Sequence, residues 1–278
     1  MNPTEMTLPT TRKRVLIPIA MKVGQLFSKT LVGGAYRFGI TRHRVPTDRL
    51  THPLKLVQLS DLHFGPFHQR KSLDAWVDAT LAEAPEVIVV TGDFIDHLSG
   101  ADLEPLASAL KKLRAPLGVW GVWGNHDRSR APHIQTLEQV LDRSGIKILN
   151  NRGVLLRNDL FLAGVDDFHN GRPDLELALG ARPTDAACIL LSHNPDLLPQ
   201  VPASVGLTLC GHTHGGQIKL PLIGPPLTSS RYGKRFAEGW VEAAAPAYVS
   251  RGLGTSMLPI RFNCPPELSV LELLPTVV

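Results

Sequence analysis

The chain has 278 residues and is predicted to fold as an α/β domain of two packed sheets with helices outside. Two observations predict this class. Apolar, strand-like runs alternate with helix-like segments in the first half, and five such runs end in short polar segments. The composition, with 43% hydrophobic and 19% charged residues, is that of a globular domain with a sizeable core rather than a disordered or fibrous chain.

The first half of the chain alternates between the two kinds of element. Strands are predicted over residues 54–60, 86–91 and 117–123 from their apolar runs. Helices are predicted over residues 71–83 and 102–114, where apolar side chains recur at helical spacing. Strand, helix, strand, helix, strand is typical of a sheet with crossover connections.

The second half predicts one more helix and several shorter strands. The helix is expected over residues 133–144. The strands are expected near residues 146–149, 154–156, 160–165, 188–192, 205–210, 247–250 and 268–273. The chain shows no internal repeat.

Five polar segments follow apolar runs, where a buried strand delivers side chains to the carboxyl edge of a sheet. A lone histidine at such a place is more often structural, but the joint pattern is the inventory of a two-metal hydrolytic site. The candidate metal ligands are Asp61, His63, Asp93, Asn125, His193, His212 and His214.

The spacing of these groups suggests how they would act. Asp61 and His63 lie two residues apart, so both side chains point to one side if the chain stays extended. Gly92 allows a sharp turn before Asp93, whose two carboxylate oxygens can bridge two cations. Mixed oxygen and nitrogen ligation suits Mn²⁺, Fe or Zn²⁺ better than Ca²⁺.

Two metals about 3.5–4 Å apart clamp the attacking and departing oxygens of a displacement at phosphorus and lower the pKa of a bridging water. Hydrolysis of a phosphate ester or anhydride follows, without a covalent protein nucleophile. His126 is the candidate catalytic residue, because it should reach over the site and protonate the leaving group or stabilise developing charge. Asp127 is expected to hydrogen-bond an imidazole and fix its tautomer.

At these residues the sequence resembles the calcineurin-like metallophosphoesterase superfamily. The pattern Asp-x-His, Gly-Asp, Gly-Asn-His-(Asp/Glu), His and Gly-His-x-His is complete and in order from Asp61 to His214. The resemblance implies a four-layer α/β/β/α sandwich over roughly residues 54–275. It also implies one metal on Asp61, His63 and His214, a second on Asn125, His193 and His212, Asp93 between them, and His126 as the catalytic histidine.

A narrower likeness lies near the C-terminus, at residues 248–256, 259–262 and 266–267. These segments resemble a bacterial branch that contains a manganese-dependent phosphodiesterase and an enzyme cleaving UDP-2,3-diacylglucosamine in lipid A biosynthesis. Two divalent ions are therefore expected, with Mn²⁺ first and Fe or Zn²⁺ as alternatives. A phosphodiesterase acting on nucleic acid or cyclic nucleotides is the competing function, and a non-catalytic scaffold is disfavoured because no ligand is missing.

The net positive charge of the chain comes from its N-terminal segment. Residues 1–60 hold ten Lys or Arg and two acidic residues, a net charge of +8, and the remaining 19 basic and 23 acidic residues give −4. We therefore divide the chain into a basic segment, residues 1–53, and a catalytic domain, residues 54–278, with a connector over residues 41–53. Phosphate backbones are held by Lys and Arg, and the catalytic part of the chain has a net negative charge. Specific nucleic-acid binding is therefore not expected.

Residues 15–40 are apolar but interrupted by Lys22, Lys29 and Arg37, so no run approaches the roughly 20 residues that span a bilayer. As a helix, this segment would have an apolar and a basic face. It could lie in a membrane interface or pack on the protein's own core, and both readings stay open. With three cysteines of no metal-type spacing, a cytoplasmic location is expected. Peripheral contact at the inner face of the membrane is expected only under the first of these two readings.

Other polar residues are given structural interpretations. Arg261 is expected to be a structural cation, while Arg251 is equally suited to structure or to substrate phosphate. Asp166 and Asp167 are expected to hydrogen-bond their loop rather than form a third metal site, and Tyr232 is expected to pack within a loop. The remaining histidines are expected at the surface or in loops: His43, His52, His68, His97, His133 and His169.

Overall fold

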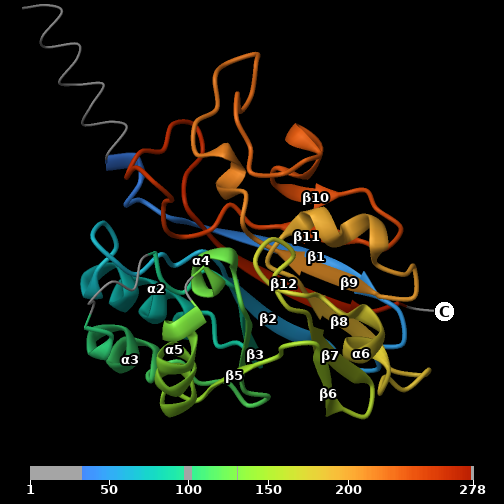
Figure 1. The fold of residues 1–278 in the computed structure, drawn as a ribbon. Coiled ribbons are helices and arrows are strands. Elements are labelled where there is room, and N and C mark those ends of the chain that lie inside the picture. Colours follow the sequence, from blue (N-terminus) through green and yellow to red (C-terminus); the bar gives the residue numbers. More distant parts are fainter. Residues whose placement is uncertain (1–32, 97–101, 130, 277–278) are drawn as a thin grey trace, which may run out of the picture.

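The computed structural model describes residues 33–96, 102–129 and 131–276. Within this part, two mixed six-stranded sheets face each other and helices flank them (Figure 1). This is the expected α/β/β/α arrangement.

The first sheet has the strand order β1-β12-β2-β3-β4-β5. Strands β2, β3, β4 and β5 are parallel to one another, with β5 at the edge, and β12 is antiparallel to β2. The bounds are β1 Gly39–Thr47, β2 Leu54–Leu59, β3 Val87–Thr91, β4 Val119–Val122, β5 Ile146–Ile148 and β12 Glu267–Pro275.

The second sheet has the order β10-β11-β9-β8-β7-β6. Strands β11, β9, β8 and β7 are parallel, and the outer strands β10 and β6 are antiparallel to their neighbours. The bounds are β6 Arg152–Arg157, β7 Leu160–Gly164, β8 Ala187–Leu191, β9 Leu207–Cys210, β10 Gly239–Val241 and β11 Ala247–Val249.

Alternation along the strands assigns each side chain to one of two cores. In β2, Leu54 and Leu56 face the core between the sheets, while Val57 and Leu59 face the helical layer. That outer layer consists of α2 Arg70–Ala82, α3 Glu104–Leu110 and α5 Ala131–Arg143. On the far side, α6 Leu175–Leu179 and the 3₁₀ helix η1 Pro195–Gln200 cover the second sheet. Shorter pieces are α4 Asn125–Arg128, η2 His214–Gly216 and η3 Gly233–Phe236.

The expected elements are present, with two corrections. The expected connector over residues 41–53 is wrong for its first part, because residues 39–47 form the edge strand β1 along β12. The short elements α6 and β10 were not expected. The predicted amphipathic segment, residues 15–40, lies outside the described residues as far as residue 32, and its last two residues belong to β1. The division at residue 53 stays a prediction. Among the described residues no helix is long and apolar enough to cross a bilayer.

Candidate metal centre and catalytic site

All seven predicted ligands follow the carboxyl ends of parallel strands. Three of these strands belong to the first sheet and two to the second. Strand β2 leads to Asp61 and His63, β3 to Asp93, and β4 to Asn125. Strands β8 and β9 lead to the remaining three, His193, His212 and His214. The two sheets meet here, where the backbone N–H of His212 donates to Asp61 Oδ1 over 2.9 Å.

Most of these ligands sit in a left-handed backbone conformation. Asp61, His63, Asp93, His212 and His214 have φ between 45° and 72°. The chain therefore does not stay extended after Asp61, and the alternation argument for Asp61 and His63 is wrong in its reason although both side chains reach the same place. Non-glycine residues at positive φ carry strain of about 1 kcal/mol or more and cluster at functional sites.

Two glycines let the turns after β3 and β4 pack backbone against backbone. An ideal Cβ on Gly92, at φ +83°, would lie 2.8 Å from the Gly124 Cα. A Cβ on Gly124 would lie 2.1 Å from Asp93 Oδ1 and 2.4 Å from the Asp93 backbone nitrogen. The space that Asp93 occupies therefore depends on Gly124 having no side chain.

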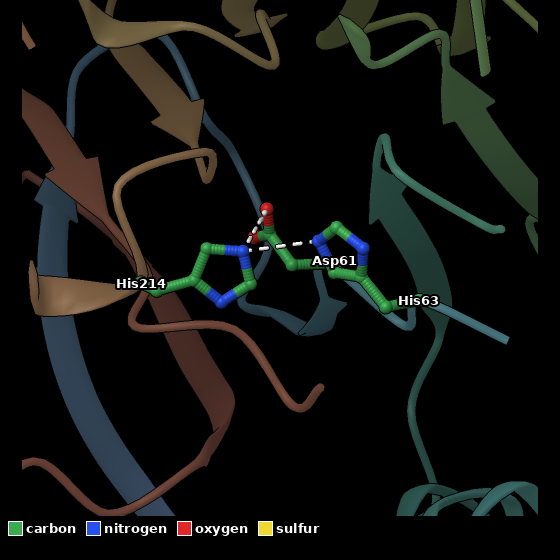
Figure 2. A group of neighbouring side chains, drawn as sticks. All are labelled: Asp61, His63 and His214. Atoms are coloured by element: carbon green, nitrogen blue, oxygen red, sulfur yellow. Dashed lines mark hydrogen bonds and ion pairs between the residues drawn. The ribbon is translucent and has the colours of Figure 1, made fainter. Parts of the chain in front are cut away.

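The first group of donors consists of Asp61, His63 and His214, and Figure 2 shows them facing one another. The two Nε2 atoms of His63 and His214 are 3.0 Å apart, and His214 Nε2 is 3.5 Å from Asp61 Oδ1. Two imidazole nitrogens bound at right angles to one cation at about 2.1 Å would be about 3.0 Å apart. The spacing of these donors fits a shared divalent ion.

The second group consists of Asn125, His193 and His212. His193 Nε2 lies 3.0 Å from Asn125 Oδ1 and 3.2 Å from His212 Nδ1. The opposite ring nitrogens face backbone carbonyls: His193 Nδ1 is 2.8 Å from Thr91 O, and His212 Nε2 is 3.2 Å from Ser229 O. Each ring donates the N–H on that side to the carbonyl, which fixes the ring and leaves its other nitrogen facing inward, where a metal would displace any proton on it.

Asp93 lies between the two groups. Its Oδ2 is 3.4 Å from His63 Nε2 and 3.4 Å from His193 Nε2, and its Oδ1 accepts the backbone N–H of His126 over 2.9 Å. The carboxylate is buried, so its charge is little screened. This position lets one carboxylate serve two cations.

The electrostatics favour donor forms at His212, His214 and Asp93. Burial lowers the pKa of His193, but Asp93 outweighs burial and holds it well above the usual value, so His193 is the charged partner of Asp93. Burial, with the nearby His193, lowers the pKa of His212 to about 3. Burial, His63 and Arg261 hold the pKa of His214 well below its usual value, so both rings are neutral. Burial raises the pKa of Asp93, but the charge and hydrogen bond of His193 outweigh burial and keep it well below the usual range.

His126 reaches the same centre, with its ring centroid 4.7 Å from that of His63. A residue that the sequence reasoning missed lies behind it. Asp96 places Oδ1 3.3 Å from His126 Nδ1 and 3.5 Å from His63 Nδ1, and its backbone oxygen is 3.1 Å from His126 Nδ1. Burial lowers the pKa of His126, but Asp96 and Asp93 outweigh burial and raise it to about 9.

Asp127 does not have its expected role. Its Oδ2 accepts the Gly124 backbone N–H over 2.9 Å and its Oδ1 that of Ile95 over 3.3 Å. Among the described residues, neither oxygen is hydrogen-bonded to an imidazole. Burial and the neighbouring Asp93 raise the pKa of Asp127 to about 8. The residue braces the turn that presents Asn125, and backbone carbonyls orient the imidazoles instead.

The two arginines near the site are held by protein groups. Arg261 is 2% exposed and donates to backbone oxygens that include Arg251 O at 2.7 Å and Gly254 O at 2.6 Å, as expected of a structural cation. Arg251 forms an ion pair with the buried Glu267 over 2.6 Å, which favours the structural reading for it as well.

The other polar residues follow expectation except for two histidines. His43 lies half-buried in strand β1, with its ring centroid 4.7 Å from that of Tyr248. Asp166 accepts from Arg128 and the Arg172 backbone, and Asp167 from two backbone N–H groups of its loop. The Tyr232 ring packs on Phe236. His68, expected at the surface, is buried, with Nε2 2.9 Å from Thr255 Oγ1. His97 lies outside the described residues.

Comparison with known proteins places this centre in a family. The sequence profile described as calcineurin-like phosphoesterase matches residues 54–216, which run from β2 through the last predicted ligand. The chain belongs to this family. Its members are metal-dependent hydrolases of phosphorylated substrates, and the clustered His and Asp residues described above can bind metal ions.

Similar bacterial proteins agree with this placement. The uncharacterized metallophosphoesterase YkuE of Bacillus subtilis (strain 168) is 33% identical over 243 residues, covering 84% of each chain. The phosphodiesterase YaeI of Escherichia coli (strain K12) is 28% identical over 247 residues, covering 85% of this chain and 88% of that protein. An uncharacterized metallophosphoesterase of Aquifex aeolicus (strain VF5) is 31% identical, covering 86% and 92%. The bacterial branch expected from the sequence is consistent with these relatives.

Proposed function

We propose that this metallophosphoesterase hydrolyses phosphodiester or pyrophosphate bonds with two divalent ions, Mn²⁺ in the first place and Fe or Zn²⁺ as alternatives. The observation that carries the proposal is the position of Asp93, whose Oδ2 lies 3.4 Å from one imidazole of each donor group. A carboxylate shared by two donor sets is the arrangement that a two-metal centre requires.

The seven residues would divide into two sets. Asp61, His63 and His214 would hold one cation, the second set would hold the other, and Asp93 would contact both. When bound, the two cations would supply positive charge to the attacking and departing oxygens at phosphorus. The second set is Asn125, His193 and His212.

The protein's own groups would complete the reaction. Nδ1 of His126 faces Asp96, so we assign proton delivery to the leaving oxygen to Nε2 of the same ring. Asp96 would act by holding this ring at the rim, because both its carboxylate and its backbone oxygen face Nδ1. No side chain needs to form a covalent bond to phosphorus.

For the substrate we propose an amphiphilic phosphodiester or pyrophosphate, such as UDP-2,3-diacylglucosamine, met at the inner face of a membrane. The support is the net charge of +8 in residues 1–60, which suits an anionic surface, and the relative named a phosphodiesterase. The net charge of −4 over residues 61–278 disfavours a nucleic-acid polyanion.

The test is a substrate panel on the metal-loaded protein. Hydrolysis of bis(p-nitrophenyl) phosphate with Mn²⁺, lost in Asp93→Asn and His126→Ala, would support the reaction class. UDP-2,3-diacylglucosamine, a phospholipid and a cyclic nucleotide would then be compared at equal concentration. Wild-type protein that carries two metals by mass spectrometry but cleaves none of these compounds would overturn the proposal, and preference for the cyclic nucleotide would overturn the lipid assignment.

A further inference from the structure

Two loops beside the metal centre expose apolar side chains at their tips. Leu222 is fully exposed, at 108% of its reference area, and Met257 and Leu227 are exposed to 85% and 80%. Soluble proteins rarely expose several large apolar side chains this completely within two short segments. Where they do, the exposed patch usually marks an interaction site. The apolar tip residues are Leu220, Leu222, Ile223, Leu227, Met257 and Leu258.

The two loops are joined at their bases. The Gln217 side chain accepts the Ser256 backbone N–H over 2.7 Å and donates to the Ser256 carbonyl over 3.1 Å. Ile218 pairs with Phe262 as an isolated bridge, and Leu220 pairs with Gly224 to turn the first loop. The six residues therefore belong to one joined pair of loops, which we call the apolar rim, at the upper side of the molecule in Figure 1.

The exposed positive charge of this region lies on the first loop. Arg231, Lys234 and Arg235 are exposed there, and residues 217–237 contain no Asp or Glu. Lys219 is paired with Glu238, and in the second loop Arg251 is paired with Glu267 and Arg261 is buried. The rest of the catalytic region is acidic on balance, so this charge is local. Apolar tips above a basic base match the acyl region and the anionic headgroups of a bilayer in that order.

The shape of the rim also favours a bilayer over a protein partner. Its apolar residues lie in or beside turns and bends and are exposed to between 39% and 108% of their reference areas. Lipid can close around each such side chain separately, whereas one rigid partner surface would have to match both loops. Gly34 also lies in this region, since an ideal Cβ on it would be 2.8 Å from the Arg261 carbonyl oxygen.

We infer that the apolar rim is a membrane-docking surface, which inserts its tips into an anionic bilayer. The first loop of the rim begins three residues after His214, and its returning segment places Ser229 O 3.2 Å from His212 Nε2. Docking through this surface would hold the metal centre at the headgroup layer. That consequence for substrate choice rests on the proposed function, while the docking itself does not.

The experiment measures binding of the full chain to vesicles of phosphatidylglycerol and phosphatidylcholine, and to phosphatidylcholine alone, by co-sedimentation. The double variant Leu222→Ser/Ile223→Ser should lose binding to the anionic vesicles by about tenfold or more, since interfacial affinity scales with inserted apolar area. Leu177→Ser is the matched control, because Leu177 is 65% exposed on α6. Mn²⁺-dependent hydrolysis of bis(p-nitrophenyl) phosphate in solution should be equal in all three proteins.

A second readout locates the contact directly. When vesicles are added, the Leu222→Trp variant should show tryptophan fluorescence that shifts to the blue and is quenched by brominated lipid. The Leu177→Trp variant should show neither change. Wild-type protein that ignores anionic vesicles would overturn the inference. Vesicle binding that Leu222→Ser/Ile223→Ser leaves unchanged would also overturn it and would assign docking to the N-terminal segment. A wild-type protein that binds no vesicles but forms a dimer, which this variant makes monomeric, would overturn it as well.

Discussion

Replacing Gly124 by alanine tests whether the position of Asp93 controls the metal centre. The added Cβ would lie 2.1 Å from Asp93 Oδ1, where an ordinary contact is 3.4 Å or more, so something must move by about 1.3 Å. Gly124 has φ −102° and ψ 175°, an extended conformation that alanine adopts freely. The perturbation is therefore steric and acts on the one carboxylate that faces both donor groups.

A displacement of about 1 Å at a catalytic centre costs about 100-fold in rate. We expect Gly124→Ala to lower kcat/KM for bis(p-nitrophenyl) phosphate by about that factor and to weaken binding of at least one of the two metals. Metal content by mass spectrometry and steady-state kinetics with saturating Mn²⁺ are the assays. Circular dichroism and thermal unfolding establish that the variant is folded.

Gly39→Ala is the matched control, because an added Cβ there would meet nothing within 4 Å and its backbone is not left-handed. This variant should keep full activity and two metals. If folded Gly124→Ala also bound two metals and worked within about threefold of wild type, the centre would tolerate movement of Asp93, and the assignment of Asp93 between two cations would fail.

Three further outcomes are expected. Mn²⁺ at about 100 times its dissociation constant should stabilise the fold by about 2.7 kcal/mol per site, which raises Tm by roughly 5–10 °C, and Asp93→Asn should remove most of that shift in calorimetry. His126→Ala should lower kcat about 100-fold or more while mass spectrometry still finds two metals, and loss of metal instead would make His126 a ligand. Burial raises the pKa of Asp159, but hydrogen bonds from Thr51 and Arg157 outweigh burial and lower it to about 2. The ionised Asp159 therefore stabilises the fold above about pH 4, and this contribution is lost as the pH falls towards 2. Asp159→Asn should therefore cost about 1 kcal/mol at pH 6, allowing for surface screening, and the gap to wild type in urea unfolding should narrow by pH 3.

The strand ends could be predicted from sequence because parallel strands deliver their next residues to a common edge. Asp96 could not, since its role depends on a contact between distant segments. The Asp96 backbone N–H donates to Phe64 O over 3.0 Å, and this bridge brings the carboxylate to His63 and His126. Nothing local distinguishes Asp96 from other loop acids.

Strand β1 was missed for a related reason. Its sequence around Arg42, His43 and Arg44 is polar and basic, as expected of an edge strand, and its partner β12 lies more than 200 residues away in the chain. Asp127 was misassigned because spacing shows only that it is near the site. Its partners, the N–H groups of Gly124 and Ile95, are set by how two turns pack.

The fold separates what makes the protein stable from what makes it reactive. The left-handed turns that carry the ligands store strain, while the core between the sheets, which includes Leu56, Val89 and Ile189, contains none of the ligands. Replacing a ligand should therefore change chemistry and metal binding without removing the packing that holds the sheets together. For this reason Asp93→Asn, unlike a substitution in the core, tests the metal centre and not the fold.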